Sequence, residues 1–260
     1  MAYFNIKIYS QALRRTVCVE MFLPNDNMEY YAENNKYYQR STKALLLLHG
    51  YNNCAENWVG EELARRYNFA VVMPNGENSF WLDSQATGRK FCTFIGEELI
   101  GYVQRTFSLA KDREDTCVMG LSMGGFGALH TAFTYPDTFS KVCAMSSALI
   151  VHEIARMKPG DDNGMANYEY YRQCFGELHQ LEGSSSDPEA LVKALKAQKK
   201  RIPEIFMSCG TEDFLLDKNR AFHEFLLKEK IEHTYLESPG SHDMDFWREY
   251  CYVFCEKMFG

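Results

Sequence analysis

One short stretch, Gly120-Leu-Ser-Met-Gly124, restricts the fold of this chain more than any other part of it. The apolar run Cys117-Val-Met119 precedes it and predicts a buried strand, and the helix-like segment Gly127–Phe133 follows it. A strand that turns into a helix within so few residues crowds its backbone, so small residues are needed two positions before and two after the serine. The two glycines supply them. The pattern therefore predicts a strand, a tight turn and a helix, with Ser122 raised above the edge of a sheet.

Strand and helix patterns alternate on both sides of this unit. Continuous apolar runs such as Ala44–Leu48 are typical of strands buried on both faces of a sheet. Two alternating segments, Phe4–Tyr9 and Thr16–Leu23, predict an antiparallel pair at the sheet edge. We expect one α/β domain, residues 1–260, with a mostly parallel central sheet flanked by helices. The other expected elements are strands at Phe69–Met73, Thr116–Gly120, Val142–Met145, Ile205–Cys209 and Glu232–Leu236, and helices at Glu56–Tyr67, Phe94–Phe107 and Gly124–Phe133.

The segment 151–186 interrupts this alternation. It contains Pro159-Gly-Asp-Asp162, a tyrosine-rich stretch and Gly183-Ser-Ser-Ser186. We interpret it as a cap-like or lid-like insertion over the carboxyl edge of the sheet, where open α/β sheets bind ligands. A plain surface excursion is the alternative, because long loops are either functional or simply mobile.

The candidate nucleophile Ser122 needs a base, because a serine hydroxyl is weakly nucleophilic until a neighbour takes its proton. His242 directly follows the last predicted strand in a loop of turn-forming residues, which places it at the carboxyl edge of the sheet. We therefore predict His242 as the base. The other downstream histidines are His130 and His223 inside predicted helices, His233 at the start of the last strand, and the rivals His152 and His179 in the insertion.

An acid that orients the histidine is expected on the loop after the preceding strand, because the usual chain order is serine, acid, histidine. Gly210-Thr-Glu-Asp213 is that loop. Glu212 and Asp217 are the competing candidates. The side chain of Glu212 should point away from that of the adjacent Asp213, and Asp217 falls within the next predicted helix. We choose Asp213, which would accept the second ring N–H of His242 and stabilise the imidazolium.

Two backbone N–H groups are expected to hold the oxyanion, those of Met123 and Tyr51. Tyr51 follows His49-Gly50, where the glycine would let the backbone approach a substrate closely. His49 itself is expected to tie this loop down through its two ring nitrogens.

Charge and cysteine usage exclude several classes of function. The chain has 35 acidic and 28 basic residues, a net charge of −7, and this balance argues against a nucleic-acid partner.

No apolar run approaches the roughly 20 residues of a membrane span, and the N-terminus does not read as a secretory signal. The odd number of nine scattered cysteines favours reduced thiols and a cytoplasmic protein. Cys251 and Cys255 lack partners with metal-ligand spacing, so we expect no metal and no cofactor.

Five ordered blocks give the chain a resemblance to the esterase D group of the α/β-hydrolase superfamily, which includes tributyrin esterases, S-formylglutathione hydrolases and the feruloyl and acetylxylan esterases of carbohydrate esterase family one. The blocks are Leu47-Leu-His-Gly-Tyr51, Met73-Pro-Asn-Gly76 with Trp81 and Asp83, Gly120–Leu129, Cys209–Leu215 and Pro239–Trp247. The resemblance implies an α/β-hydrolase fold and a serine carboxylesterase. It puts Ser122, Asp213 and His242 on catalytic positions, Tyr51 and Met123 on oxyanion positions, and Gly50 and Trp81 at the substrate.

Within this group the chain departs from the S-formylglutathione hydrolases, which usually carry histidine where this chain has Leu121 and Phe126. We therefore favour the tributyrin and feruloyl esterase branch, with a small ester as substrate, such as a plant cell-wall phenolic or an acylated sugar. An S-formylglutathione hydrolase-like thioesterase and an acetylxylan esterase are the alternatives. An acyltransferase and a silent binding protein of the same fold are further ones, because fold alone does not choose between them. Homo-oligomerisation is left open.

Overall fold

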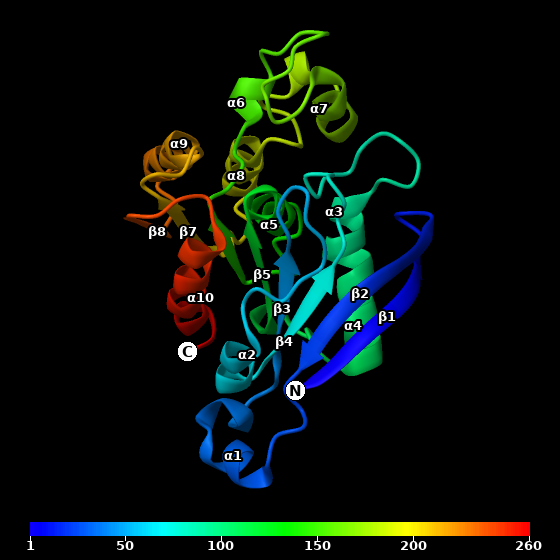
Figure 1. Ribbon diagram of the computed structural model, residues 1–260, viewed down its shortest axis with the longest axis vertical. Helices are drawn as coiled ribbons and strands as arrows, with labels where there is room; N and C mark the ends of the chain where they lie inside the picture. The colour runs from blue at the N-terminus through cyan, green and yellow to red at the C-terminus, as the bar shows by residue number, and fades with distance from the viewer.

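The apolar runs form an eight-stranded sheet in the computed structural model, which describes residues 1–260 (Figure 1). Its strand order is β1-β2-β4-β3-β5-β6-β7-β8. The first two strands pair antiparallel at one edge, as predicted, β2 also pairs antiparallel with β4, and all other neighbours are parallel. The strands are β1 (Ala2–Ser10), β2 (Arg15–Leu23), β3 (Lys43–Leu48), β4 (Phe69–Pro74), β5 (Thr116–Leu121), β6 (Lys141–Met145), β7 (Glu204–Gly210) and β8 (His233–Ser238).

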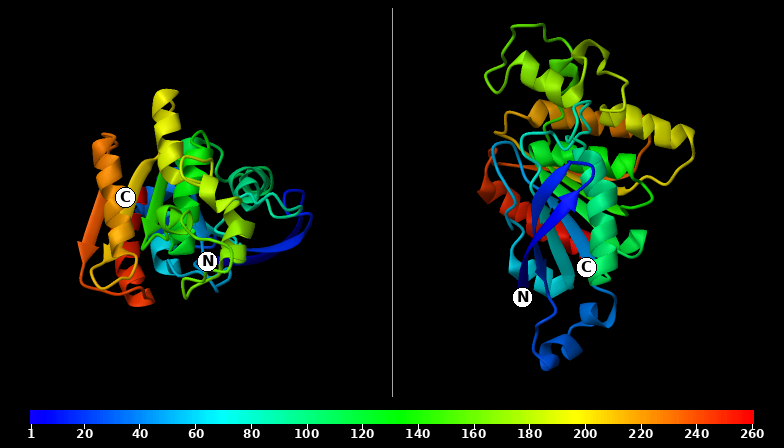
Figure 2. Two further views of the ribbon diagram at one scale, coloured as in Figure 1. Left: turned by 90° about the horizontal axis from the view of Figure 1, so that it is seen from above. Right: turned by 90° about the vertical axis from the view of Figure 1, so that its right-hand side faces the viewer.

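Helices cover both faces of this sheet, which confirms the predicted α/β-hydrolase architecture (Figure 2). The α-helices are α1 (Glu29–Asn34), α2 (Glu61–Tyr67), α3 (Phe91–Thr93), α4 (Ile100–Phe107), α5 (Met123–Thr134), α6 (Val151–Ile154), α7 (Tyr168–Phe175), α8 (Pro188–Ala197), α9 (Leu216–Lys228) and α10 (Met244–Phe259). The short turns are the 3-10 segments η1 (Lys36–Gln39), η3 (Arg113–Asp115) and η4 (Leu178–Gln180) and the π-helical η2 (Phe94–Leu99).

The run in β3 is continuously apolar because each of its faces meets a separate core. Leu45 and Leu47 pack with α2 and α10, whereas Leu46 and Leu48 pack with the larger core that contains α4, α5, α8 and α9. Successive side chains of a strand point to opposite faces, so a strand covered on both sides needs apolar residues at every position. The same reasoning applies to β4 and β5, which are buried along their whole length.

Helix boundaries depart from the sequence prediction in two places. Helix α2 begins at Glu61 rather than Glu56, because Gly60 holds a positive φ of 89° that a helix does not allow. The helix expected at Phe94–Phe107 begins earlier, at Phe91, and passes through the π-helical turn before α4. In that turn the ring of Tyr135 lies against Gly96 so closely that an added Cβ would be 2.3 Å from it.

The segment 151–186 forms α6, α7 and η4 and lies above the carboxyl ends of the strands (Figure 1). Its aromatic side chains are packed rather than solvated. Tyr171 is 2% exposed, and the rings of Phe175 and Phe80 lie with their centroids 4.8 Å apart. Buried aromatic area of this kind fixes the segment to the domain.

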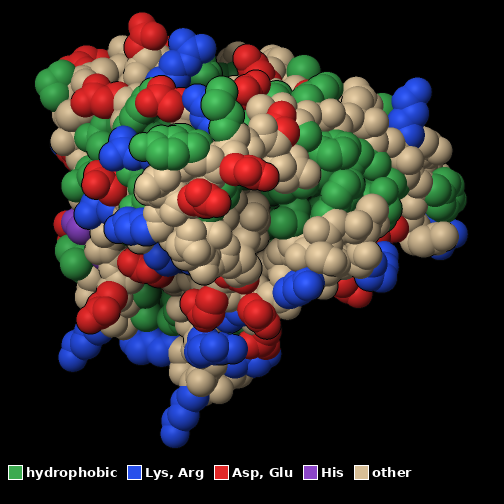
Figure 3. All heavy atoms as spheres, turned by 90° about the horizontal axis from the view of Figure 1, so that it is seen from below, with side chains coloured by type: hydrophobic (Ala, Val, Ile, Leu, Met, Phe, Trp, Pro, Cys, Tyr) green, Lys and Arg blue, Asp and Glu red, His purple; other side chains and the backbone are tan.

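The opposite end of the molecule carries the chain termini and α1. On the face seen from below, basic and acidic side chains are interspersed, and apolar side chains gather in a patch toward the right of the view, so this face offers no continuous basic surface to a phosphate backbone (Figure 3). None of the helices combines the length and the apolar character needed to cross a bilayer.

Candidate active site

The serine turn has the strained geometry that its sequence predicts. Ser122 follows β5 and caps α5, and its backbone has φ 55° and ψ −120°, a conformation that non-glycine residues rarely adopt. The turn is possible because its flanking glycines lack side chains. A Cβ on Gly120 would lie 2.0 Å from the carbonyl oxygen of Gly124, and a Cβ on Gly124 would lie 2.1 Å from that of Leu48.

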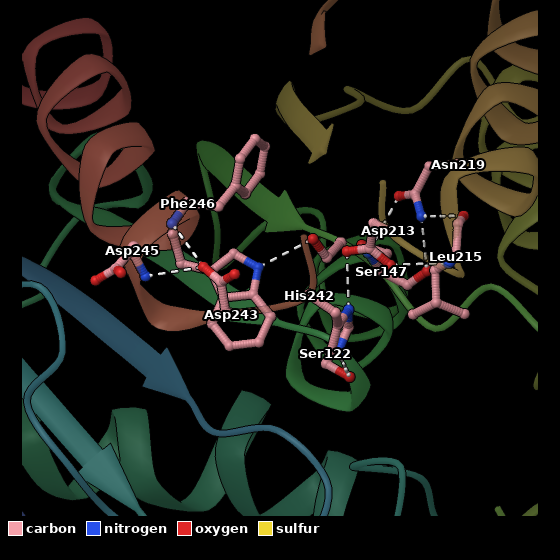
Figure 4. A network of polar contacts seen from close by, with 11 residues as sticks. Ser122, Ser147, Asp213, Leu215, Asn219, His242, Asp243, Asp245 and Phe246 are labelled. Atoms are coloured by element: carbon pink, nitrogen blue, oxygen red, sulfur yellow. Dashed lines mark hydrogen bonds and ion pairs between the residues drawn. The ribbon is translucent and has the colours of Figure 1, made fainter. Parts of the chain in front are cut away.

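Ser122, His242 and Asp213 lie in one hydrogen-bonded chain (Figure 4). The Ser122 hydroxyl donates to His242 Nε2 at 3.0 Å, and His242 Nδ1–H donates to Asp213 Oδ2 at 2.8 Å. The three residues follow β5, β8 and β7 at the carboxyl edge of the sheet. The structure thus brings together the three residues that the sequence singled out, in the predicted order of contact.

The carboxylate of Asp213 is set up to stay ionised. Its side chain is fully buried, which by itself raises its pKa. Hydrogen bonds from His242, from the Ser146 hydroxyl and from the Leu215 N–H outweigh that effect and leave the pKa below the ordinary value for aspartate. A negative charge therefore faces His242 Nδ1 throughout the neutral pH range.

Asn219, on α9, connects the loop after β6, which contacts the backbone of Ser122, to the loop of the acid, and the sequence analysis missed it. It is fully buried, its Oδ1 accepts from the Ser147 N–H at 3.1 Å, and its Nδ2 donates to the carbonyl oxygens of Ser147 and Leu215. The neighbouring Ala148 N–H donates to the Ser122 carbonyl, and Leu215 N–H donates to Asp213. No sequence signal marked Asn219, because a polar residue in a helix usually faces solvent.

Trp247 supports the histidine from α10. Its indole N–H donates to Ser146 Oγ at 2.9 Å. Its ring packs edge-to-face against the ring of His242, with the two ring centroids 4.9 Å apart. The exposed ring of Phe214 also lies beside His242, with the two ring centroids 4.6 Å apart. These two aromatic rings limit the positions that the imidazole can occupy.

Both predicted oxyanion residues border the same pocket as Ser122. Tyr51 and Met123 line it, and Met123 is the first residue of α5, where a backbone N–H has no acceptor within the helix. His49 holds the Tyr51 loop as expected. Gly76 N–H donates to His49 Nε2, so Nδ1 carries the proton and donates to the Gly50 carbonyl. Burial lowers the pKa of His49, which favours this neutral form.

Trp81 does not line the pocket, so that expectation is wrong. Its side chain is 0% exposed, and its indole N–H donates to the carbonyl oxygen of His49 at 3.2 Å. The ring packs against Gly76 and Gly127, where a Cβ on either glycine would lie within 2.6 Å of it. Trp81 is therefore core packing beneath the site. Gly50 is also buried, with a Cβ position 3.4 Å from Ser122 Cβ, so it permits the close approach of two backbones rather than contact with a ligand.

The rival candidates lie outside the hydrogen-bonded chain. Glu212 accepts from the Gly240 N–H, and Asp217 lies in α9 as the sequence indicated. His152 contacts Glu182 and Glu189, which are both in or beside the insertion, and His179 contacts only its neighbour Gln180. None of them contacts Ser122 or His242.

A cavity of about 230 Å³ opens in front of Ser122. Most of its lining is apolar. Tyr170 and Tyr171 of α7 form one wall with Phe80, and Phe214 forms another beside His242. The polar side chains in its wall include Glu153, Asn163 and Lys218. An apolar pocket with a few convergent polar groups is the usual form of a small-molecule site.

Comparisons with known proteins agree with this geometry. A model of the esterase family, described as "Putative esterase", matches residues 10–250. An acetyl esterase from Caldicellulosiruptor saccharolyticus is 41% identical over 259 residues, which cover 96% of this chain and 95% of that protein. Two Staphylococcus aureus structures superimpose over 100% of this chain at 25% identity. They are a substrate-bound fluorophosphonate-binding serine hydrolase F, with TM-score 0.84 and 98% of its chain covered, and an S-formylglutathione hydrolase, with TM-score 0.81 and 99% covered. The chain therefore belongs to the esterase family, among serine hydrolases of the α/β-hydrolase fold.

Proposed function

We propose that this esterase hydrolyses small carboxylic esters through an acyl-enzyme on Ser122. The observation that carries the proposal is the continuous hydrogen-bonded chain from Ser122 through His242 to the buried carboxylate of Asp213. Such a chain activates a hydroxyl because the histidine can take its proton while the carboxylate stabilises the imidazolium.

Each step of the reaction has a residue to perform it. Ser122 Oγ attacks the ester carbonyl carbon while His242 Nε2 takes the serine proton, and the N–H groups of Tyr51 and Met123 hold the oxyanion. The carbon–oxygen bond to the alcohol then breaks, and the leaving oxygen takes the proton from His242. A water molecule, deprotonated by His242, attacks the acyl-enzyme. The carboxylic acid leaves, and Ser122 regains its proton.

A short acyl group, acetyl above all, is the preferred acyl part of the proposed substrate. The cavity in front of Ser122 is small, and the acetyl esterase relative is similar along nearly its whole length. A hydroxycinnamoyl group is the second candidate, because three aromatic side chains, Phe80, Tyr170 and Tyr171, border the cavity and favour a flat acyl group. A glutathione thioester is less favoured. Leu121 and Phe126 are buried apolar residues here and leave no imidazole at either position.

The insertion 151–186 would act as a cap that selects among acyl groups. Its helix α7 supplies Tyr170 and Tyr171 to the cavity, and its loop supplies Asn163 and Met165. These side chains would exclude water and position the acyl group near Ser122, and such gains come from orientation rather than from new chemistry.

The test is hydrolysis by wild type and by Ser122→Ala, with Ser41→Ala as a matched control on an exposed serine outside the pocket. Substrates are p-nitrophenyl acetate, p-nitrophenyl butyrate, methyl ferulate and S-formylglutathione. We expect the acetate and butyrate esters to be hydrolysed fastest, Ser41→Ala to match wild type, and Ser122→Ala to lose about 10⁴-fold or more in kcat. Near-wild-type rates in Ser122→Ala would overturn the proposal. Fastest turnover of methyl ferulate would move the assignment to the second candidate.

A further inference from the structure

Residues 76–81 follow β4 and support the loop 49–52, which follows β3. The Gly76 N–H donates to His49 Nε2 at 2.9 Å, and the Trp81 indole N–H donates to the His49 carbonyl oxygen at 3.2 Å. Because β3 and β4 are parallel neighbours, both loops leave the sheet at its carboxyl edge, where Ser122 also lies. The segment after β4 takes no part in the steps of the reaction, yet it holds a loop that does.

The loop 49–52 carries the Gly50–Tyr51 peptide, and one hydrogen bond fixes the direction of that peptide. His49 Nδ1–H donates to the Gly50 carbonyl oxygen at 2.8 Å, so this oxygen faces the imidazole. The peptide is trans, and the N–H of a trans peptide points opposite to its C=O. The Tyr51 N–H therefore points away from His49, and it donates no hydrogen bond within the protein. Tyr51 lines the same cavity as Ser122 and Met123.

Asn52, the next residue, is held by a reciprocal pair of hydrogen bonds with Asn78. The Asn52 backbone N–H donates to Asn78 Oδ1 at 2.8 Å, and Asn78 Nδ2 donates to Asn52 Oδ1 at 2.8 Å. Asn52 has a φ of 59°, a left-handed conformation that asparagine tolerates better than most residues but that surrounding contacts must still hold. The Asn78 amide supplies those contacts, so it fixes the turn directly after the Tyr51 N–H.

Asn78 is itself held in place by neighbouring contacts. Its carbonyl oxygen accepts from the Cys174 thiol of α7 at 3.5 Å, and its side chain is only partly exposed. The next residue, Ser79, is buried, and its hydroxyl donates to the Gly76 carbonyl at 2.6 Å and accepts from the Trp81 N–H at 3.1 Å. A side chain on a turn that is fixed in this way can hold the loop that it contacts in one position.

We propose that Asn78 is a positioning residue of the oxyanion hole. Together with His49, it holds the Gly50–Tyr51 peptide in one orientation. The N–H of that peptide then points at the carbonyl oxygen of an ester bound at Ser122. The proposal rests on the esterase function proposed above. Asn78 does not line the cavity, so it acts through the peptide and not on the substrate. Its effect is largest where negative charge forms on the carbonyl oxygen, because the N–H bonds more strongly to an oxyanion than to a neutral carbonyl.

The experiment compares Asn78→Ala and Asn52→Gly with wild type. Asn78→Ala removes both hydrogen bonds of the pair, whereas Asn52→Gly removes the side-chain bond, keeps the backbone N–H and tolerates the positive φ. Asn53→Ala is the matched control. Asn53 is exposed in the same loop, and its side-chain oxygen also accepts a backbone N–H, but that N–H belongs to the adjacent Cys54.

Four quantities are measured for each variant: kcat and KM for p-nitrophenyl acetate, the inhibition constant of trifluoroacetone, and Tm. Trifluoroacetone reports on the oxyanion hole because it adds reversibly to the activated serine. Ser122 Oγ bonds to the ketone carbon, His242 takes the serine proton, and the ketone oxygen becomes an oxyanion. An inhibitor that resembles the transition state loses affinity when stabilisation of that state is lost.

We expect Asn78→Ala to lose about 10- to 100-fold in kcat, with KM within about twofold of wild type, because a displaced oxyanion donor costs at most what a deleted one does. Trifluoroacetone should bind more weakly by a similar factor. Asn52→Gly should lose less in both quantities, and this smaller paired loss tests the proposal even if Asn78→Ala fails to fold. Asn53→Ala should match wild type.

Two results would overturn the positioning role. One is a kcat and a trifluoroacetone affinity that stay at the wild-type level in folded Asn78→Ala. The other is a loss of kcat that trifluoroacetone binding does not share, because the variant would then disturb some step other than oxyanion stabilisation. If Ser122→Ala hydrolyses p-nitrophenyl acetate as fast as wild type does, the esterase function itself fails instead.

Discussion

Replacing Asn219 by alanine tests whether the catalytic loops depend on one buried amide. Asn219 contacts Ser147 on one side and Leu215 on the other, and these residues adjoin the backbone contacts of Ser122 and Asp213. The substitution removes three hydrogen bonds at a fully buried position. We therefore expect it to lower both the free energy of unfolding and the rate of the chemical step.

The size of the expected stability loss follows from the hydrogen bonds that Ser147 and Leu215 keep without the Asn219 amide. The Ser147 carbonyl still accepts from the Leu149 N–H, and the Leu215 carbonyl still accepts from the backbone N–H of residue 219. Only the Ser147 N–H loses its acceptor. One orphaned buried N–H costs about 1–3 kcal/mol. Because Ser147 and Leu215 can then shift independently, the triad loses alignment, and a displacement of about 1 Å is enough to cost about 10²-fold in rate.

The assay combines urea denaturation with steady-state kinetics on p-nitrophenyl acetate. Asn34→Ala is the control, because Asn34 is exposed and its amide bonds only to a carbonyl within its own helix. We expect Asn219→Ala to lose stability in the stated range and to lose kcat with little change in KM, while Asn34→Ala stays within about 0.5 kcal/mol of wild type. Equal stability and equal kcat for the two variants would refute the reasoning.

Three further substitutions test other parts of the structure. Gly120→Ala would place a Cβ 2.0 Å from the backbone oxygen of Gly124, which has no room to move. We therefore expect the substitution to destabilise the fold by about 3 kcal/mol or more, the upper end of the usual cost of overpacking, and a lowered Tm would measure this loss. Ser147→Ala removes a buried hydroxyl that has no partner, so the urea midpoint should stay the same or rise; a clear fall would reveal a missing contact. His152 contacts the carboxylates of Glu182 and Glu189, and these contacts raise its pKa. The protonated histidine therefore stabilises the folded state below pH about 6.5, and this contribution is lost as the pH rises through the folded-state pKa. His152→Gln should therefore flatten the decrease in stability from pH 6 to pH 8, by less than about 1 kcal/mol because the side chain is half exposed, and an unchanged pH dependence would contradict this.

The positions of the triad could be predicted from local sequence because each member directly follows a strand. Parallel strands end at the same edge of the sheet, so residues after β5, β7 and β8 converge there whatever the remaining packing. Glycines around Ser122 and turn formers before His242 mark where those strands end. The fold class followed from the same alternation of apolar runs and helix patterns.

Trp81 and Asn219 are the residues where sequence reasoning failed, and for related reasons. An indole beside the end of a strand can contact a ligand or pack in the core. Trp81 packs in the core because Gly76 and Gly127, which lack side chains, leave space for its ring. Burial of Asn219 depends on contacts between loops more than 60 residues apart in the chain, and no local pattern encodes these.

The central claim is that Ser122 is the single activated nucleophile, and covalent labelling tests it most directly. Wild type, Ser122→Ala and His242→Ala would be treated with a fluorophosphonate, and the adduct located by mass spectrometry of the digested chain. We expect one adduct per chain, on Ser122, absent in Ser122→Ala and formed far more slowly in His242→Ala because the serine has lost its base. An adduct on another residue, or esterase activity that persists after Ser122 is fully labelled, would contradict the claim.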